Sequence, residues 1–178
     1  SQQGVALFRN AALVSEAPAT FDELVKASTA ITQGEQIGAI LERGFLYAGA
    51  HLNGLGGKLM DAQGMPAFNT DSGLAWMDLL GAFEQAGPTV DFNDQDLDAF
   101  KQGRVGFIID GTWNMQALAD ALGAENLAVD PWPAYKDGAL SGYIQPGVAF
   151  LSSQSSGPDQ AAALMFMEAL VSPEAQLH

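Results

Sequence analysis

The chain has 178 residues, of which 48% are hydrophobic and 16% charged, a composition typical of one globular domain with its own core. Seven basic residues against 21 acidic ones give a formal net charge of -14, which argues against nucleic-acid binding because such a surface repels phosphates. The lack of cysteine excludes disulfides, thiolate zinc sites and a thiol nucleophile, and no apolar run approaches the ~20 residues of a membrane span.

Local patterns in the first third of the chain predict a strand and two helices. The strand-like segment covers residues 5–8. A capping box formed by Thr20 and Glu23 opens a helix over residues 20–34, whose apolar side chains recur with helical spacing. The following stretch is mostly apolar and interrupted by glycines, and we predict a helix there over about residues 40–52.

The rest of the chain alternates between helix and strand patterns. We expect, in order, helices at 71–86 and 93–102, a buried strand at 104–110, a helix at 114–122, strands at 127–129 and 147–151, and a helix at 158–171. Helices that lie between short strands indicate an α/β fold.

Motifs for catalysis or metal binding do not withstand inspection. His51 and His178 are the only histidines, so the chain has neither a zinc-protease motif nor a histidine-based triad. The glycine-rich segment 54–58 lacks the spacing of a phosphate loop. The acidic run 91–98 lacks the glycine and glutamate of a calcium loop and is better explained as a helix start, where the helix dipole favours carboxylates. We expect no metal and no cofactor.

Trp113 is the strongest candidate for ligand binding. It follows Asp110 and Gly111 at the end of a predicted buried strand, which is the edge where open α/β sheets hold ligands. An isolated tryptophan is more often a core residue, but polar neighbours favour a sugar site here, since the indole stacks on the ring and the carboxylate pairs with hydroxyls. We expect Trp113 to be solvent-accessible on a concave surface. Trp76 and Trp132 are interpreted as structural.

Six blocks of the chain, taken in order, resemble the carbohydrate-binding extracellular solute-binding proteins of ABC importers, the maltose-binding-protein-like group. The blocks are ALFRNAALV with PATFDEL (6–14 and 18–24), GGKLMD (56–61), AFKQGRVGFIIDGTWN (99–114), VDPWP (129–133), GVAF (147–150) and AALMFMEALVSPEAQ (162–176). The chain departs from the family pattern at Phe21, where tryptophan is usual, and at Thr112, where proline is usual. The resemblance begins in the middle of that pattern, which implies a lobe-sized fragment that lacks the N-terminal part.

The resemblance implies the second lobe of a two-lobe periplasmic-binding-protein fold of type II, in which two α/β lobes close on a sugar. Residues 1–142 would form that lobe, and residues 143–178 would be a crossover strand and helices that return to the other lobe. The implied function is non-catalytic binding of a sugar or oligosaccharide for delivery to ABC permease subunits. The implied location is periplasmic or extracellular, and the full-length protein could be a membrane-tethered lipoprotein.

The resemblance also implies a set of ligand-binding residues. Trp113 matches the tryptophan that commonly stacks on the ligand, and Asp110 and Gly111 lie beside it at the mouth of the cleft. The other candidates match the family by position alone: Glu42, Tyr47, His51 and Asn53.

Two other classes of function stay open from the sequence. A glycan-acting enzyme would need two carboxyl groups ~5–9 Å apart, and the sequence singles out no such pair. A structural or interaction module is compatible with the acidic surface. The negative charge suits a neutral sugar, and a polyamine or another cationic ligand would also suit it.

The predicted helix at 158–171 is apolar nearly all round. Asp159, Gln160 and Glu168 are its main polar positions, so it needs cover on more than one side. We therefore expect the isolated chain to dimerise through this helix, or to rearrange the arm 143–178 against its own lobe.

Overall fold

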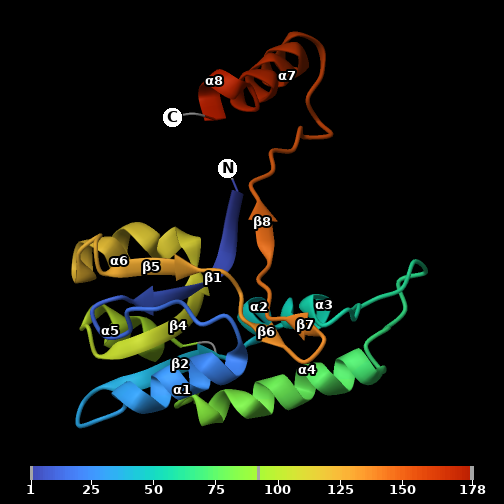
Figure 1. Ribbon diagram of the computed structural model, residues 1–178. Helices are drawn as coiled ribbons and strands as arrows, with labels where there is room; N and C mark the ends of the chain where they lie inside the picture. The colour runs from blue at the N-terminus through green and yellow to red at the C-terminus, as the bar shows by residue number, and fades with distance from the viewer. Residues whose placement is uncertain (1, 92, 177–178) are drawn as a thin grey trace. The chain divides into compact units, whose positions relative to one another are not determined.

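The computed structural model describes residues 2–91 and 93–176 (Figure 1). These residues divide into two compact units, of which the larger comprises Gly4–Ile144. The smaller unit contains the described residues from Gln145 onward together with residues 2–3. That residues 143–178 return to another lobe stays a prediction.

The larger unit is built on a mixed sheet with the strand order β3-β2-β4-β1-β5. The strands are β1 (Gln2–Asn10), β2 (Ile37–Glu42), β3 (Thr89–Val90), β4 (Val105–Gly111) and β5 (Leu127–Asp130). Strand β2 runs parallel to β3 and β4, whereas β1 runs antiparallel to β4 and β5. A further strand, β8 (Ile144–Pro146), pairs with β1, and β6 (Ala134–Tyr135) and β7 (Gly138–Ala139) form a separate hairpin.

Helices cover both faces of this sheet. The helical elements are α1 (Phe21–Ile31), α2 (Phe45–Ala48), α3 (His51–Gly54), α4 (Asp71–Ala82), η1 (Phe83–Gln85), α5 (Gln95–Lys101), η2 (Thr112–Asn114) and α6 (Met115–Leu122). Helices α1 and α4 lie next to each other below β2 in Figure 1 and share one core cluster with Leu41 and Ile109. Helices α5 and α6 bury side chains in a second cluster with Ile40 and Ile108. Successive side chains of a strand point to opposite faces of the sheet, and helices cover both of these faces. All seven residues of β4 are therefore buried.

Several elements form where local sequence signals predicted them. The capping box is present, with the Glu23 backbone N–H donating to Thr20 Oγ1 at 3.2 Å and the Thr20 backbone N–H donating to Glu23 Oε2 at 3.3 Å. The expected buried strand at 104–110 is β4, and the carboxylate-rich segment at 93–102 starts helix α5. The α/β fold class is therefore confirmed.

Two predictions of secondary structure are wrong. The helix predicted over residues 40–52 is instead the strand β2 followed by the short helices α2 and α3. An internal parallel strand is apolar on both faces, so its sequence has no period that separates it from a buried helix. The strand predicted at 147–151 is also wrong, because β8 ends at Pro146 and the next five residues have no regular secondary structure.

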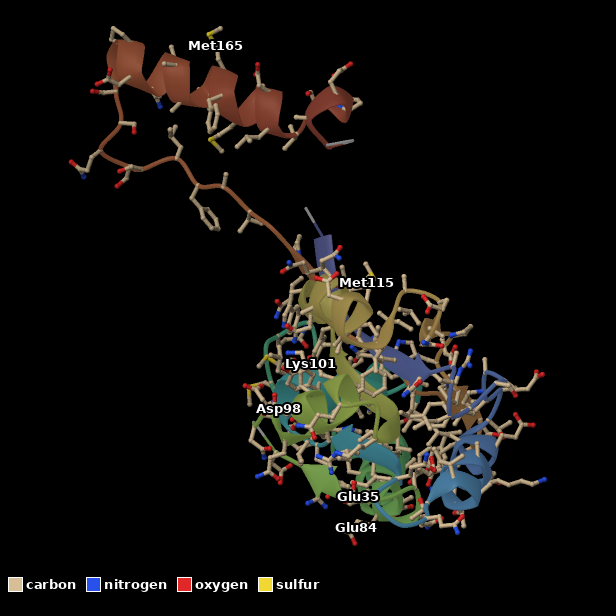
Figure 2. The ribbon with its side chains drawn as sticks, turned by 90° about the vertical axis from the view of Figure 1, so that its left-hand side faces the viewer. Glu35, Glu84, Asp98, Lys101, Met115 and Met165 are labelled. Carbon is tan, nitrogen blue, oxygen red and sulfur yellow. The ribbon has the colours of Figure 1, made fainter. Side chains whose placement is uncertain are left out.

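The smaller unit contains α7 (Gly157–Leu170) and α8 (Pro173–Gln176). No residue of α7 is buried, and Met165 and Phe166 are 70% and 65% exposed (Figure 2). The helix therefore presents apolar side chains that nothing within this unit covers, as the sequence indicates. Dimerisation through it stays a prediction. Within the described part of the chain, no helix is both long and apolar enough to cross a bilayer.

Candidate functional site

The carboxyl ends of β2 and β4 bring two acidic side chains together. These strands are parallel neighbours, and Ile40 lies opposite Ile108. Glu42 and Asp110 follow these positions by two residues at the same end of their strands, and the charges of both act on Tyr47 and on Asp96. Both residues are almost completely buried, with 2% and 4% of their surface exposed. The sequence analysis listed them separately, and the parallel pairing makes them one feature.

Hydrogen bonds from the backbone and from one amide hold these two carboxylates. The Gly44 N–H donates to Glu42 Oε1 at 2.7 Å, and the Gly111 N–H donates to Asp110 Oδ1 at 2.6 Å. The Asn114 side-chain amide donates to Asp110 Oδ2 at 3.1 Å. Burial raises the pKa of Asp110, and the hydrogen bonds from Gly111 and Asn114 act in the opposite direction. Gly111 therefore contributes a backbone donor and holds the Asp110 carboxylate in place.

Two aromatic side chains lie close to this pair of carboxylates. Tyr47 on α2 and Trp113 in η2 have ring centroids 6.4 Å apart at an interplanar angle of 51°, and both rings are half-buried against the core. Burial, followed by the negative charges of Asp110 and Glu42, raises the pKa of Tyr47 to about 12, so its phenol stays neutral. The indole of Trp113 is thus partly accessible. That it faces a concave surface stays a prediction.

Asp96 is a third buried carboxyl group that the sequence analysis missed. It lies in the first turn of α5 and is only 4% exposed. Burial, followed by the charges of Asp110 and Glu42, raises its pKa to about 7. The sequence analysis interprets the whole run at 91–98 as a carboxylate-rich helix start and does not single out Asp96. The signal that could have found Asp96 is its helical spacing, because residues three and four positions later, Ala99 and Phe100, are both buried.

His51 is a core residue, and its prediction as a ligand contact does not fit the structure. The side chain is fully buried, Nδ1 accepts a hydrogen bond from the Ser141 N–H at 3.0 Å, and the rings of Phe83 and Trp132 pack on the imidazole. Burial lowers its pKa to about 4. An enclosed, neutral imidazole cannot reach a ligand, so we leave His51 out of the site. Asn53 is exposed on the same short helix, and its role stays a prediction.

The other two tryptophans occupy structural positions. Trp76 is half-buried and donates its indole N–H to the Ala48 carbonyl oxygen at 2.9 Å. Trp132 is half-buried against the core and against His51. Trp76 thus connects α4 to α2, and Trp132 packs against α3.

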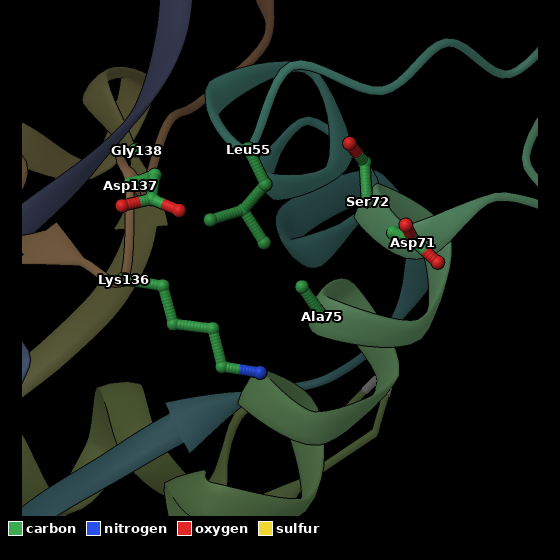
Figure 3. A pocket seen from close by; sticks show the side chains of 7 residues that line it. All are labelled: Leu55, Asp71, Ser72, Ala75, Lys136, Asp137 and Gly138. Atoms are coloured by element: carbon green, nitrogen blue, oxygen red, sulfur yellow. The ribbon is translucent and has the colours of Figure 1, made fainter.

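A separate hollow lies between the start of α4 and the β6–β7 hairpin (Figure 3). Its volume is about 280 Å³, and its lining residues are Leu55, Asp71, Ser72, Ala75, Lys136, Asp137 and Gly138. None of the candidate residues lines it. The Lys136 ammonium is already paired with Asp78, with Nζ and Oδ2 2.9 Å apart. We assign no function to this hollow, because its charged groups are exposed and the lysine is engaged.

Metal binding has no support in the described part of the chain. Within residues 2–91 and 93–176, no group of three or more histidine, aspartate or glutamate side chains is arranged to hold a metal ion. The cluster of Glu42, Asp96 and Asp110 is therefore considered as a set of hydrogen-bonding and charged groups.

Comparison with known proteins gives a family and a fold. The model of the bacterial extracellular solute-binding protein family matches residues 1–178. The GacH receptor of Streptomyces glaucescens, solved unliganded and with acarbose, superposes with a TM-score of 0.75 at 22% identity, covering 98% of this chain and 48% of that chain. Maltose-bound MalE3 of T. maritima gives a TM-score of 0.77 at 19% identity, covering 99% and 50%.

A third similar structure is the maltose-maltodextrin binding protein of Alicyclobacillus acidocaldarius, with a TM-score of 0.73 at 22% identity, covering 99% of this chain and 48% of that one. The chain thus spans about half the length of the solved structures that it matches. A comparison with curated protein sequences gives no match.

Proposed function

Because the chain belongs to the bacterial extracellular solute-binding protein family, we propose that it supplies one lobe of a receptor that binds a sugar or oligosaccharide and delivers it to an ABC importer. Proteins of this family are binding receptors and not enzymes. The α/β fold with its mixed sheet matches about half of the two-lobed structures, in keeping with a single lobe. Residues 143–178 would then return to the other lobe.

One observation supports the sugar in particular, namely the aromatic pair Tyr47 and Trp113 beside the carboxylates of Glu42 and Asp110. A sugar ring has an apolar C–H face that stacks on an indole, and hydroxyls that donate to carboxylates. Hydrogen bonds to an ionised carboxylate are about twice as strong as those between neutral groups. Carboxyl ends of parallel strands are also where open α/β sheets hold their ligands. These residues combine both kinds of contact at that edge.

The same groups support one class of solute over the others. The GacH receptor was solved with acarbose and MalE3 with maltose, and these ligands belong to those proteins. The charges of Glu42 and Asp110 act on Asp96, and the charge of Asp94 acts on Asp110, and this concentration of acidic groups suits a neutral polyol or a cation better than an anion. We propose a neutral oligosaccharide, because its apolar C–H face can stack on the indole while its hydroxyls donate to the carboxylates. A cation could also stack on the indole, and it is the alternative that the titration below tests.

Binding by this lobe alone should be weak. In the proposed receptor the second lobe completes the contacts and excludes water on closure. Each ~1.4 kcal/mol of lost contact weakens affinity tenfold, so we expect millimolar dissociation constants or weaker. A tight complex would contradict the proposal that half of the site is missing.

The test is a titration of the 15N-labelled chain with maltotriose, in which NMR monitors the signals of the three indole N–H groups. We expect the Trp113 signal to move, and the signals of Trp76 and Trp132 to stay in place. The variant Trp113→Ala should lose the response, whereas Trp76→Phe, the matched control, should keep it. A response to spermidine without one to maltotriose would favour the cationic ligand, and turnover of a chromogenic glycoside would favour the enzyme.

A further inference from the structure

Strands β1 and β8 are the two places where the chain passes from one compact unit to the other. The boundaries lie between Gln3 and Gly4 on β1 and between Ile144 and Gln145 on β8. The two strands pair with each other (Figure 1). The contacts that Gly4 makes therefore hold the β1 crossing point to the larger unit.

On one side, Gly4 is bonded to a side chain instead of to a strand. The pairing of β1 with β4 ends at Val5 and Gly111, so the next pair would be Gly4 with Thr112. Thr112 begins the short helix η2, and the Gly4 N–H donates to its Oγ1 at 3.0 Å. On the other side of β1, the Val5 N–H donates to the Tyr143 carbonyl oxygen at 2.9 Å, since N–H groups alternate in direction along a strand. The Thr112 hydroxyl thus extends the ladder between β1 and β4 by one bond.

Thr112 is also part of the turn that carries the Trp113 indole. Its carbonyl oxygen accepts the Met115 N–H at the end of η2. The Trp113 indole folds back onto Gly111, where an added Cβ would overlap the ring, so the residues on the two sides of Thr112 contact each other. A shift of the Thr112 backbone therefore moves the indole, while the Thr112 hydroxyl is bonded to Gly4.

We propose that Thr112 is a positioning residue that couples the Trp113 indole to Gly4, at the β1 crossing point. A ligand that packs on the indole restrains the turn that contains Thr112 and so strengthens the bond from Gly4. Coupling between two sites is reciprocal, so a change at Gly4 also alters the affinity for that ligand. The ligand part of this inference rests on the proposed function, whereas the coupling of Trp113 to Gly4 does not. Proline, which is usual at position 112 in the family pattern, has no hydroxyl, so the bond is not general to that pattern.

The first measurement tests the hydrogen bond without any ligand. Hydrogen exchange of the backbone amides is followed by NMR in the 15N-labelled chain. Thr112→Val keeps the shape of the side chain and removes the acceptor, so the Gly4 amide should exchange about 2–10-fold faster, the factor that one neutral hydrogen bond supplies. The Val5 amide should keep its rate, which shows that β1 is still paired. Thr112→Ser keeps a hydroxyl and should retain the wild-type rate at Gly4.

The matched control is Thr29→Val. It removes a hydroxyl that donates to the Val25 carbonyl oxygen within α1, at an exposed position, and it should leave exchange at Gly4 unchanged. An unchanged Gly4 rate in Thr112→Val would overturn the proposal. A wild-type Gly4 amide that exchanges as fast as in an unfolded peptide would overturn it as well.

The second measurement tests the coupling by a double-mutant cycle, again without a ligand. Trp113→Ala removes the ring that packs on Gly111, so in the wild-type background it should speed exchange at Gly4. In the Thr112→Val background the same change should have no further effect at Gly4. Equal effects in the two backgrounds would show that Thr112 does not carry the coupling.

The third measurement adds maltotriose. Exchange at Gly4 should slow in the wild type and in Thr112→Ser, but not in Thr112→Val. By reciprocity, Thr112→Val should weaken the affinity for maltotriose by about the factor of that slowing. Slowing that persists in Thr112→Val, or none in a wild type whose Trp113 signal responds, would overturn the proposal. If maltotriose leaves the Trp113 signal in place while the double-mutant cycle shows coupling, the proposed sugar is wrong and the coupling stands.

Discussion

Two buried groups should give the free energy of unfolding opposite dependences on pH. Burial lowers the pKa of His51 from 6.5 to about 4. Between these two pH values the unfolded chain binds a proton at His51 that the folded chain does not bind. The stability that His51 contributes is present above pH 6.5 and is lost as the pH falls towards 4. Burial raises the pKa of Asp96 from 3.8 to about 7, so its contribution is present below pH 3.8 and is lost as the pH rises towards 7.

The two effects nearly offset each other between about pH 4 and pH 6.5. Where one state holds a proton that the other lacks, the free energy of unfolding changes by about 1.36 kcal/mol per pH unit. Relative to the wild type, Asp96→Asn should therefore gain about 2–3 kcal/mol of stability when the pH rises from about 4.5 to 6.5. His51→Asn should lose about the same amount over that range. Asn is chosen at position 51 because its Oδ1 can still accept the Ser141 N–H.

The assay is urea unfolding at a series of pH values, followed by tryptophan fluorescence, since all three tryptophans lie in the unit Gly4–Ile144. Any uniform loss of stability from repacking shifts a whole curve, so the slope with pH is the readout. Asp98→Asn, an exposed change on α5, should follow the wild type. Parallel slopes for the wild type and both buried-site variants would refute the reasoning, because neither group would then differ in proton binding between the two states.

Three further predictions concern packing. Arg9→Ala should lower the free energy of unfolding by about 3–5 kcal/mol, measured in urea, because it leaves Asp130 buried without the guanidinium that donates to it at 2.7 Å. A loss under about 1 kcal/mol would show that the pair contributes little to stability. Trp113→Ala should cost about 1–3 kcal/mol, since the ring is only half-buried, and a larger loss would mark it as a core residue. Gly111→Ala should displace the indole, because an added Cβ would overlap the Trp113 ring. The NMR signal of the Trp113 indole should therefore move, and its response to maltotriose should fall. An unchanged indole signal would contradict this.

Local signals in the sequence determined many of the elements. The capping box of Thr20 and Glu23 is a contact between residues three apart, so the chain pattern contains all the information that it needs. The glycine and turn residues around β4 limit that strand in the same way. The adjacency of Asp110, Gly111 and Trp113 also follows from the chain itself, and the sequence therefore predicted that part of the candidate site.

Only the tertiary structure decided β2 and the partners of the site. Residues 37–42 form a strand because β3 and β4 pair with them on both sides, and an apolar run with glycines carries no sign of that pairing. The same pairing puts Glu42 and Asp110 at the same end of neighbouring strands and brings Tyr47 to Trp113. The burial of His51 could not be predicted from the sequence, because the exposure of a polar side chain depends on which distant segments pack against it. For Asp96, only its helical spacing from Ala99 and Phe100 indicated burial. Those packing contacts decide that both groups are buried, and the residue types set the opposite directions of the two pKa shifts, because burial disfavours the charged form of each.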